Sequence, residues 1–246
     1  MYIHNFFTLQ NDEHLSTLEY KKMLSTLCSI NTRRFNRFNT LAVYGAMKCL
    51  DKSIHSENIG VYMATECGPV ESLRNVLQQI NDKSGILMPF DFLGLNTSAS
   101  FYVAQALQSK EKHMVLSAHQ LSFEKAIQLA YYDLQHNELE EVLIGKVDIA
   151  LDFIENYEKY ITEENAKYQE QSCWIYANNN PKNAICKIDR IEEYSNREDV
   201  LAKYNTENVH FSFSEVLQQC LLGKMDVIYI AQDKKMRSIV IHISKV

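Results

Sequence analysis

The sequence predicts an α/β fold in which a mixed sheet carries helices on its faces. Short apolar runs rich in β-branched residues, at 59–64, 114–116 and 142–151, alternate with segments of helical spacing. Clusters of glycine, proline and polar residues punctuate these segments as turn signals. A chain of 246 residues with 46% hydrophobic content is long enough to bury a substantial core behind such a sheet.

The first third of the chain is expected to contain three helices and two strands. The step Gly68-Pro69 turns the chain after the strand. The helix that begins near Phe35 has its apolar residues at helical spacing. We expect an early strand at 2–9, a short helix around 19–28, a helix at 35–50, a strand at 59–64 and a helix at 70–80.

The segment between Phe92 and Asp148 is the central unit of the predicted fold. Its first helix, around Phe101–Leu107, has almost no polar face, so we expect it to be buried. A short central strand leads into a polar corner at Ser117–Ser122, and an amphipathic helix at about 123–134 follows. A strand that enters a sharp corner before a helix exposes side chains beside free helix N–H groups, which suits a nucleophile or an oxyanion.

The last third begins with a charged, tyrosine-rich stretch at 155–171, which we interpret as an exposed excursion rather than a linker. Closing strands, a helix and a hairpin are expected over 172–246. The capping-box pattern Ser212–Glu215 marks the start of that helix, and Gly223 suits its C-terminal end. We therefore predict one domain over 1–246, with its core at 32–151.

Composition excludes several functions. A formal net charge of −6 disfavours nucleic acid as a partner, and no glycine-rich phosphate loop occurs. The six cysteines form no CxxC pair, so no metal site and no cofactor are expected, and buried thiols indicate a cytoplasmic protein. We expect no signal peptide and no membrane span, because no apolar run is long enough.

Four segments, in order over about half the chain, resemble the N-terminal half of β-ketoacyl synthases. The resemblance implies a thiolase-like fold, with a single ketosynthase N-terminal half followed by a short C-terminal helix–hairpin extension. The segments and the family patterns that they resemble are Thr32–Phe38 (RRMDRF), Ile59–Leu73 (IGVVxGT…GGLESL), Pro89–Ala99 (PF…PNxxA) and Val142–Asp148 (DVMLAGGxE).

The corner departs from the family pattern. Counting forward from Asn96 places the family's cysteine nucleophile at His119, and counting back from Gly145 places it at Gln120. Neither side chain can carry an acyl group as a thioester, because that chemistry needs a thiolate. None of the eight histidines precedes Gly-Thr, and we expect the chain to end where the family's second half begins. The resemblance therefore implies no catalytic residue and no condensation by this chain alone.

A short ketosynthase-like chain without the nucleophile is similar to the chain-length-factor subunits of type II polyketide systems. The truncated kind beside aryl polyene ketosynthases is the most similar, since Ser122-Phe123-Glu124 resembles its TFE or SFE. This resemblance implies a heterodimer with an active β-ketoacyl synthase, which elongates polyketide or fatty acyl chains on an acyl carrier protein that reaches the chain through the complex. The candidate interface or cavity residues are Asn96, Phe101, Tyr102, Gln105 and Phe123.

Other interpretations remain open. The chain can be a stand-alone remnant that binds an acyl chain or a carrier protein. Gln120 can decarboxylate a malonyl group, since an amide at a helix N-terminus can donate to an enolate oxygen. An enzyme using Cys67 or His119 is a further alternative. The less specific interpretations are a relic corner, a packing role for His119, a buried structural thiol at Cys67, and core packing of the aromatic stripe on the 101–107 helix.

Overall fold

The computed structural model describes residues 1–10, 15–50, 57–82, 94, 97–149, 170–204, 212–222 and 226–246. Its strands form one eight-stranded sheet in the order β3-β2-β4-β5-β1-β6-β8-β7. β2 runs parallel to β3 and β4, and every other neighbouring pair is antiparallel. The strands are β1 (Tyr2–Gln10), β2 (Ile59–Ala64), β3 (His113–Leu116), β4 (Glu141–Asp148), β5 (Gln171–Asn178), β6 (Cys186–Tyr194), β7 (Val227–Gln232) and β8 (Ser238–Lys245).

The helices lie close to their predicted positions, except for one that was not predicted. That helix, α7, is charged and buries only Val200, so it carries no apolar periodicity. The helices are α1 (Thr17–Leu24), α2 (Arg37–Cys49), α3 (Val70–Asn81), α5 (Thr97–Leu107), α6 (Ser122–Gln135), α7 (Arg197–Tyr204) and α8 (Phe213–Leu221). No helix in the described part of the chain is long and apolar enough to cross a membrane.

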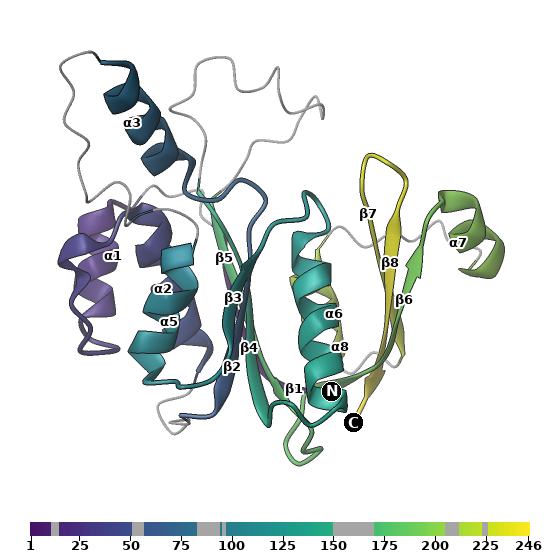
Figure 1. The fold of residues 1–246 in the computed structure, drawn as a ribbon. Coiled ribbons are helices and arrows are strands. Elements are labelled where there is room, and N and C mark those ends of the chain that lie inside the picture. The colour runs from purple at the N-terminus through teal and green to yellow at the C-terminus, as the bar shows by residue number, and fades with distance from the viewer. Residues whose placement is uncertain are drawn as a thin grey trace.

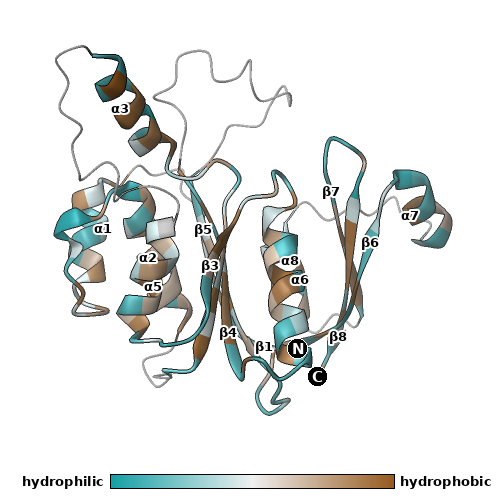
Figure 2. Cartoon of the chain, in the orientation of Figure 1, coloured by the Kyte–Doolittle hydropathy of each residue, from teal (hydrophilic) through white to brown (hydrophobic). Residues whose placement is uncertain are grey.

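Helices on both faces of the sheet create two large apolar clusters (Figures 1 and 2). α1, α2 and α5 cover one face, and α6 and α8 cover the other. Side chains alternate accordingly along β2, where Val61 and Met63 join the α2 cluster and Tyr62 and Ala64 join the α6 cluster. The mixed sheet with helices on its faces, predicted from the sequence, is confirmed.

The sheet curves so that α6 and α8 lie between its two ends (Figure 1). Their cluster contains side chains from β4 and β5 as well as from β7 and β8. The two parts of the sheet meet where β1 pairs with β6 over only Tyr2↔Lys187 and Ile3↔Cys186. The Met1 ammonium donates to the Ile188 carbonyl at this junction. β1 thus separates β5 from β6, which follow each other in the chain but do not pair with each other.

Two expectations about exposure need correction. The 101–107 helix is not buried throughout, since Phe101 is 49% exposed on α5. β3, on which α5 packs, is an edge strand rather than a central one, so within the described part of the chain no strand lies beyond this side of the helix. The charged excursion expected at 155–171 also ends earlier, because Glu170 is buried and Gln171 begins β5. Residues 155–169 lie outside the described residues, and the single domain stays a prediction.

The side chain of Trp174 occupies the space next to two glycines, Gly45 and Gly145. Its side chain is fully buried between α2 and β4, and its Nε1 donates to Ser172 Oγ at 3.0 Å. A Cβ at Gly45 would lie 2.6 Å from the indole ring, and one at Gly145 would lie 2.4 Å from it. Both positions therefore need glycine, because a rigid ring fills the space of the missing side chain.

Gly145→Ala is expected to lower the free energy of unfolding by about 1–3 kcal/mol, because the added methyl group overpacks the indole. Gly60→Ala is the matched control. Its Cβ would approach Leu139 Cδ1, at 2.4 Å, and the end of a flexible side chain can move aside. Chemical denaturation measures both variants, and equal losses would show that the indole contact is not what requires glycine.

Candidate functional site

The predicted corner is present between the end of β3 and the start of α6. His119 has a φ of 54°, the left-handed conformation that costs a non-glycine residue about 1 kcal/mol or more. Ser122 holds this conformation, since its hydroxyl accepts from Ala118 N–H at 2.8 Å and donates to the His119 carbonyl at 2.5 Å. The corner therefore presents the His119 side chain to solvent, where it is exposed.

The two residues that the resemblance predicts at the nucleophile position, His119 and Gln120, make different contacts. Gln120 is half-buried, and its Oε1 accepts the Lys234 N–H at 2.9 Å from the turn between β7 and β8. This bond ties the corner to the last hairpin and leaves the Gln120 amide N–H groups as its remaining donors. Within the described residues, no acid is hydrogen-bonded to His119. The pairing of nucleophile, base and orienting acid that covalent catalysis uses is therefore missing here.

A buried charged cluster, not predicted from the sequence, lies at the same edge of the sheet. Asp148 ends β4 and is fully buried. Its Oδ1 accepts from Thr65 Oγ1 at 2.7 Å and from the N–H groups of Glu66 and Cys67 at 2.9 and 3.1 Å. Lys146, two residues earlier on the same side of β4, pairs with Glu66. The carboxyl ends of parallel β2 and β4 meet at one edge, which brings these residues together.

Glu124 of α6 adds a third acid to this cluster. Tyr229 of β7 donates to its Oε1 at 2.6 Å, and its Oε2 has no partner in the described part of the chain. Burial raises the pKa of Glu124, and the bond from Tyr229 offsets only part of that rise. Burial by itself lowers the pKa of Lys146, but Glu66 and Asp148 outweigh it, so the net shift is upward. Lys146 thus stays charged and supplies no neutral base.

A small cavity of about 120 Å³ lies beside the corner, between the start of α6, the end of β6 and the start of β8. Each of its two cations is already paired, Lys125 with Glu193 at 2.5 Å and Arg237 with Asp233 at 2.6 Å. Ligand pockets usually measure about 300–1,000 Å³, so this cavity alone cannot enclose an extended acyl chain. Its lining residues are Ala118, Leu121, Lys125, Glu193, Tyr194, Ser195, Arg237, Ser238 and Ile239.

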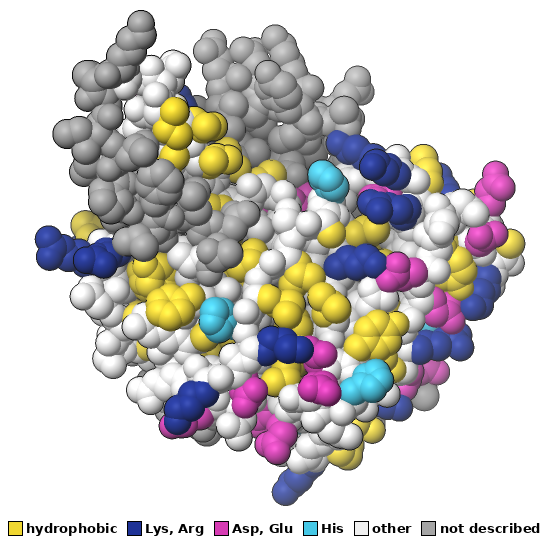
Figure 3. Space-filling model, in the orientation of Figure 1, with side chains coloured by type: hydrophobic (Ala, Val, Ile, Leu, Met, Phe, Trp, Pro, Cys, Tyr) yellow, Lys and Arg dark blue, Asp and Glu magenta, His cyan; other side chains and the backbone are white. Residues whose placement is uncertain are grey.

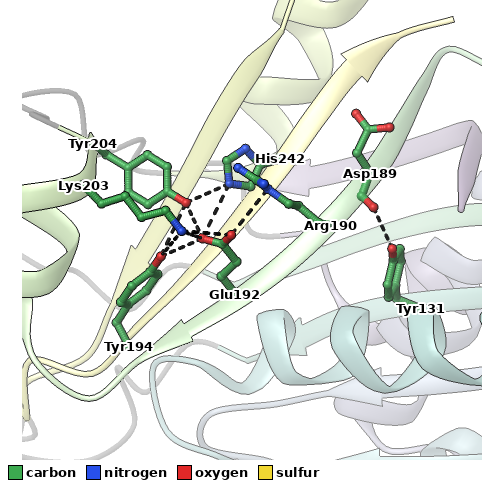
Figure 4. Close-up of polar contacts among 8 residues, drawn as sticks. All are labelled: Tyr131, Asp189, Arg190, Glu192, Tyr194, Lys203, Tyr204 and His242. Atoms are coloured by element: carbon green, nitrogen blue, oxygen red, sulfur yellow. Dashed lines mark hydrogen bonds and ion pairs between the residues drawn. The ribbon is translucent and has the colours of Figure 1, made fainter.

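A further polar cluster lies on the outer side of β6 and β8 (Figure 4). Glu192 accepts from Tyr194 OH at 2.6 Å, from Lys203 Nζ at 3.0 Å and from Tyr204 OH, which also lies 3.0 Å from His242 Nε2. Partial burial acts to raise the pKa of Glu192, but these hydrogen bonds lower it to about 2. The contacts join α7 to β6 and β8, so this cluster anchors a helix rather than forming a site.

The structure separates the residues that were predicted as interface or cavity. Phe101 and Gln105 are exposed on α5, on the opposite face of the sheet from α6, while Tyr102 is half-buried with its ring centroid 4.4 Å from that of Phe35. Phe123 is buried in the core beside Phe213 and is distant from them in the fold. The remaining predicted residue, Asn96, lies outside the described residues.

Solved structures with this arrangement cover the whole chain. A ketosynthase (ApeO) in complex with its chain length factor (ApeC) from Xenorhabdus doucetiae matches at 14% identity and a TM-score of 0.64, over 100% of both chains. The chain has the thiolase-like ketosynthase fold. The ishigamide ketosynthase/chain length factor matches at 9% identity and a TM-score of 0.70, over 100% of this chain and 99% of that one. A β-ketoacyl synthase from Burkholderia phymatum matches at 9% identity and a TM-score of 0.73, over 100% of this chain and 99% of that one.

The thiolase-like ketosynthase fold, implied by four short sequence segments, is thereby confirmed. The match includes the closing elements α8, β7 and β8, because it runs over the full length of this chain. No family model and no curated protein sequence matches the chain.

Stability is expected to depend on pH through Glu124. Because burial raises its folded-state pKa above the ordinary 4.5, its contribution is fully present below that value and is lost as the pH rises through the folded pKa. Glu124→Gln should therefore lose less stability than the wild type as the pH rises above 4.5.

Tyr229→Phe is the matched variant, and it should change the pH dependence of stability in the opposite direction. It removes the hydrogen bond that lowers the pKa of Glu124, so its stability should fall more steeply over the same pH range. Urea denaturation at several pH values measures all three proteins. Parallel pH profiles for them would exclude a titrating Glu124.

Proposed function

We propose that this chain is a non-catalytic, chain-length-factor-like subunit that pairs with an active β-ketoacyl synthase. It would help to form the cavity that holds a growing polyketide or fatty acyl chain attached to a carrier protein, of the aryl polyene type that Ser122–Glu124 resembles. One observation carries the proposal: in a chain with the ketosynthase fold, the corner Ser117–Ser122, where the sequence resemblance predicts the family's nucleophile, contains no cysteine. Two solved structures of this fold are ketosynthases with their chain length factors.

Three thiols of the described residues, those of Cys67, Cys173 and Cys49, are poorly suited to act as the nucleophile of a condensation. Cys67 is half-buried in the turn after β2, and its N–H is used in holding Asp148. Burial raises the pKa of Cys173, on β5, to about 11, and that of the Cys49 thiol even further. A thioester-forming nucleophile needs its thiolate near neutral pH, which burial disfavours. These sites therefore support a structural role for the cysteines rather than condensation.

The small size of the cavity beside the corner supports an acyl-binding site that two subunits form together, rather than one within this chain alone. About 120 Å³ beside Leu121 holds only a few atoms, whereas an elongating acyl chain needs a long apolar enclosure. A second subunit can supply the remaining wall. One solved structure of the same fold contains a type II polyketide acyl carrier protein in complex with its ketosynthase, at a TM-score of 0.75 and 10% identity. We propose that a carrier protein reaches this chain through such a complex.

A second candidate function is decarboxylation of a malonyl group by Gln120 inside that complex. One observation favours it. The bond from Lys234 N–H uses the amide oxygen of Gln120, so the amide N–H groups remain as donors beside the start of α6. Donors of this kind can stabilise the enolate that forms when CO₂ leaves.

Co-expression of this chain with the ketosynthase that is encoded nearest to it tests the first proposal. The tag belongs at the C-terminus, because the Met1 ammonium donates to Ile188 in the seam between β1 and β6. Size exclusion with light scattering should show a one-to-one complex and aggregation of the chain expressed alone. A well-behaved monomer or homodimer that ignores the ketosynthase would contradict the proposal and favour a stand-alone binding protein.

Variants of the corner residues test whether the corner only lines the cavity or takes part in catalysis. His119→Ala in the complex is expected to change the elongation rate by less than about twofold, since a general acid or base contributes about 10²–10⁴-fold. The control is alanine in place of the partner's nucleophile, which should abolish elongation. A large loss with His119→Ala would show catalysis at the corner. Loss of malonyl decarboxylation with Gln120→Ala would support the second candidate function.

A further inference from the structure

Two of the six cysteines meet in the interior of the molecule. Cys186 begins β6, Cys220 lies in the last turn of α8, and both side chains belong to the apolar cluster around α6. They are buried, unlike the interspersed charged and apolar side chains on the face shown in Figure 3. The Cys186 thiol donates a hydrogen bond to the sulfur of Cys220, and both cysteines are free, so this interior pair is a reduced dithiol.

The elements on which they lie bring the two thiols together. The inward face of α8 consists of four buried residues at positions i, i+3, i+4 and i+7, namely Phe213, Val216, Leu217 and Cys220. Cys186 lies where the two parts of the sheet meet, because it pairs with Ile3 of β1. α8 also contacts β1. The contact between the thiols therefore joins the helix to the junction of β1 and β6.

Two other thiols are satisfied by backbone carbonyls instead. Cys28 donates to the Leu24 carbonyl at 3.9 Å, and Cys49 donates to the Asn5 carbonyl at 3.8 Å. A cysteine that serves only in packing needs no second thiol beside it. A disulfide, by contrast, forms only between sulfurs that the fold already places close together, and the interior pair meets that requirement.

The hydrogen bond makes the two thiols chemically unequal. It lowers the pKa of Cys220, because it stabilises the thiolate of that residue. The same bond raises the pKa of Cys186, and burial adds to that rise. The thiolate is the form of cysteine that attacks an oxidant. Cys220 is therefore the thiol that reacts first, and Cys186 is the thiol that resolves the product.

Burial restricts which oxidant reaches the pair. Cys186 is 0% exposed and Cys220 is 5% exposed, so a bulky disulfide such as oxidised glutathione has no access to either sulfur. Hydrogen peroxide is a much smaller molecule. It has a short path to Cys220, because the next two residues, Leu221 and Leu222, are 58% and 83% exposed.

We propose that Cys186 and Cys220 are a peroxide-sensitive dithiol, which closes to a disulfide that fastens α8 to the junction of β1 and β6. The proposal concerns thiols of this chain alone and does not rest on the proposed function. The junction is where such a bond has a large effect, since β1 pairs with β6 over only two residue pairs.

The reaction takes two steps and consumes one hydrogen peroxide. The Cys220 thiolate attacks one peroxide oxygen, the O–O bond breaks, and the leaving hydroxide takes up a proton to form water. Cys220 is then a sulfenic acid. The sulfur of Cys186 attacks the sulfur of Cys220, the S–O bond breaks, and a second water leaves with the thiol proton. Two thiols are oxidised to a disulfide, and the peroxide is reduced to water.

Peptide mass spectrometry tests the site directly. Trypsin releases Cys186 in residues 183–187 and Cys220 in residues 204–224, with no other cysteine in either peptide. The full-length chain, bound to its ketosynthase or alone, is treated with a graded series of hydrogen peroxide, and the remaining thiols are blocked with N-ethylmaleimide. The two peptides should then be linked, at a mass lower by two hydrogen atoms than their sum, and dithiothreitol should separate them.

Alanine variants test the order of the two steps. Without a resolving thiol, Cys186→Ala should retain the sulfenic acid on Cys220, where dimedone should label it several-fold more than in the wild type. Cys220→Ala should form no linked peptide and carry no dimedone label on Cys186. Cys49→Ala is the matched control, since Cys49 is also 0% exposed, and it should form the linked peptide as the wild type does.

Thermal unfolding measures the effect on the junction. The oxidised wild type should unfold at a temperature about 5–10 °C higher than the reduced protein, because a disulfide constrains the unfolded chain. Cys220→Ala should show no such rise after the same treatment. The linked peptide of the wild type needs no substitution, so it decides the site whether or not alanine loosens the core.

The contrary outcomes are equally definite. Absence of the linked peptide, with or without oxidation of the half-buried Cys28 and Cys67, would overturn the proposal. A dimedone label on Cys186 in Cys220→Ala would overturn the assigned order of the thiols. A linked peptide without a rise in unfolding temperature would overturn the fastening of α8. None of these outcomes bears on pairing with a ketosynthase, which the co-expression experiment decides separately.

Discussion

Burial of α6 is the constraint on which the rest of the structure depends. Its residues Phe123, Ala126, Ile127, Ala130 and Leu134 are at most 6% exposed, and each large side chain of this kind contributes about 1.5–3 kcal/mol when buried. One side of the helix packs on β2 and β4, and another lies against the part of the sheet that contains β7 and β8. The sheet has to curve around α6 to cover both sides, and α8 fills the space beside it.

This arrangement also explains why the corner has a definite shape. The corner is the N-terminal end of a helix that is held on two sides, and Ser122 and Gln120 tie it down further. These contacts therefore fix the position of the corner. His119 has no orienting acid among the described residues, and Lys146 is held in its charged form by acids.

The third side of α6 is where the structure remains open. Leu129 and Tyr132 are 41% and 44% exposed, and β3 is the last strand at its end of the sheet among the residues that the structure describes. The same feature accounts for the exposure of Phe101 on α5, which packs on β3 from the other face.

Local signals in the sequence were sufficient for the elements and the fold class, because helix periodicity, strand composition and capping boxes are properties of neighbouring residues. They placed β2 at 59–64, found α6 and α8, and located the corner at Ser117–Ser122. Four short motifs indicated the thiolase-like ketosynthase fold. The departure at His119 and Gln120 is likewise a matter of residue identity, so the doubt about condensation needed no coordinates.

Only the tertiary structure decided which strand lies at the edge and which charges meet. Strand order depends on contacts between distant residues, so β3 seemed central by composition, and β1 was not expected between β5 and β6. The cluster of Lys146, Asp148, Glu66 and Glu124 comes from three separate segments. Its one local sign was the two charges that interrupt an apolar strand. The sequence by itself determined the elements and the missing nucleophile, and packing determined the surfaces, because burial is a property of the whole fold.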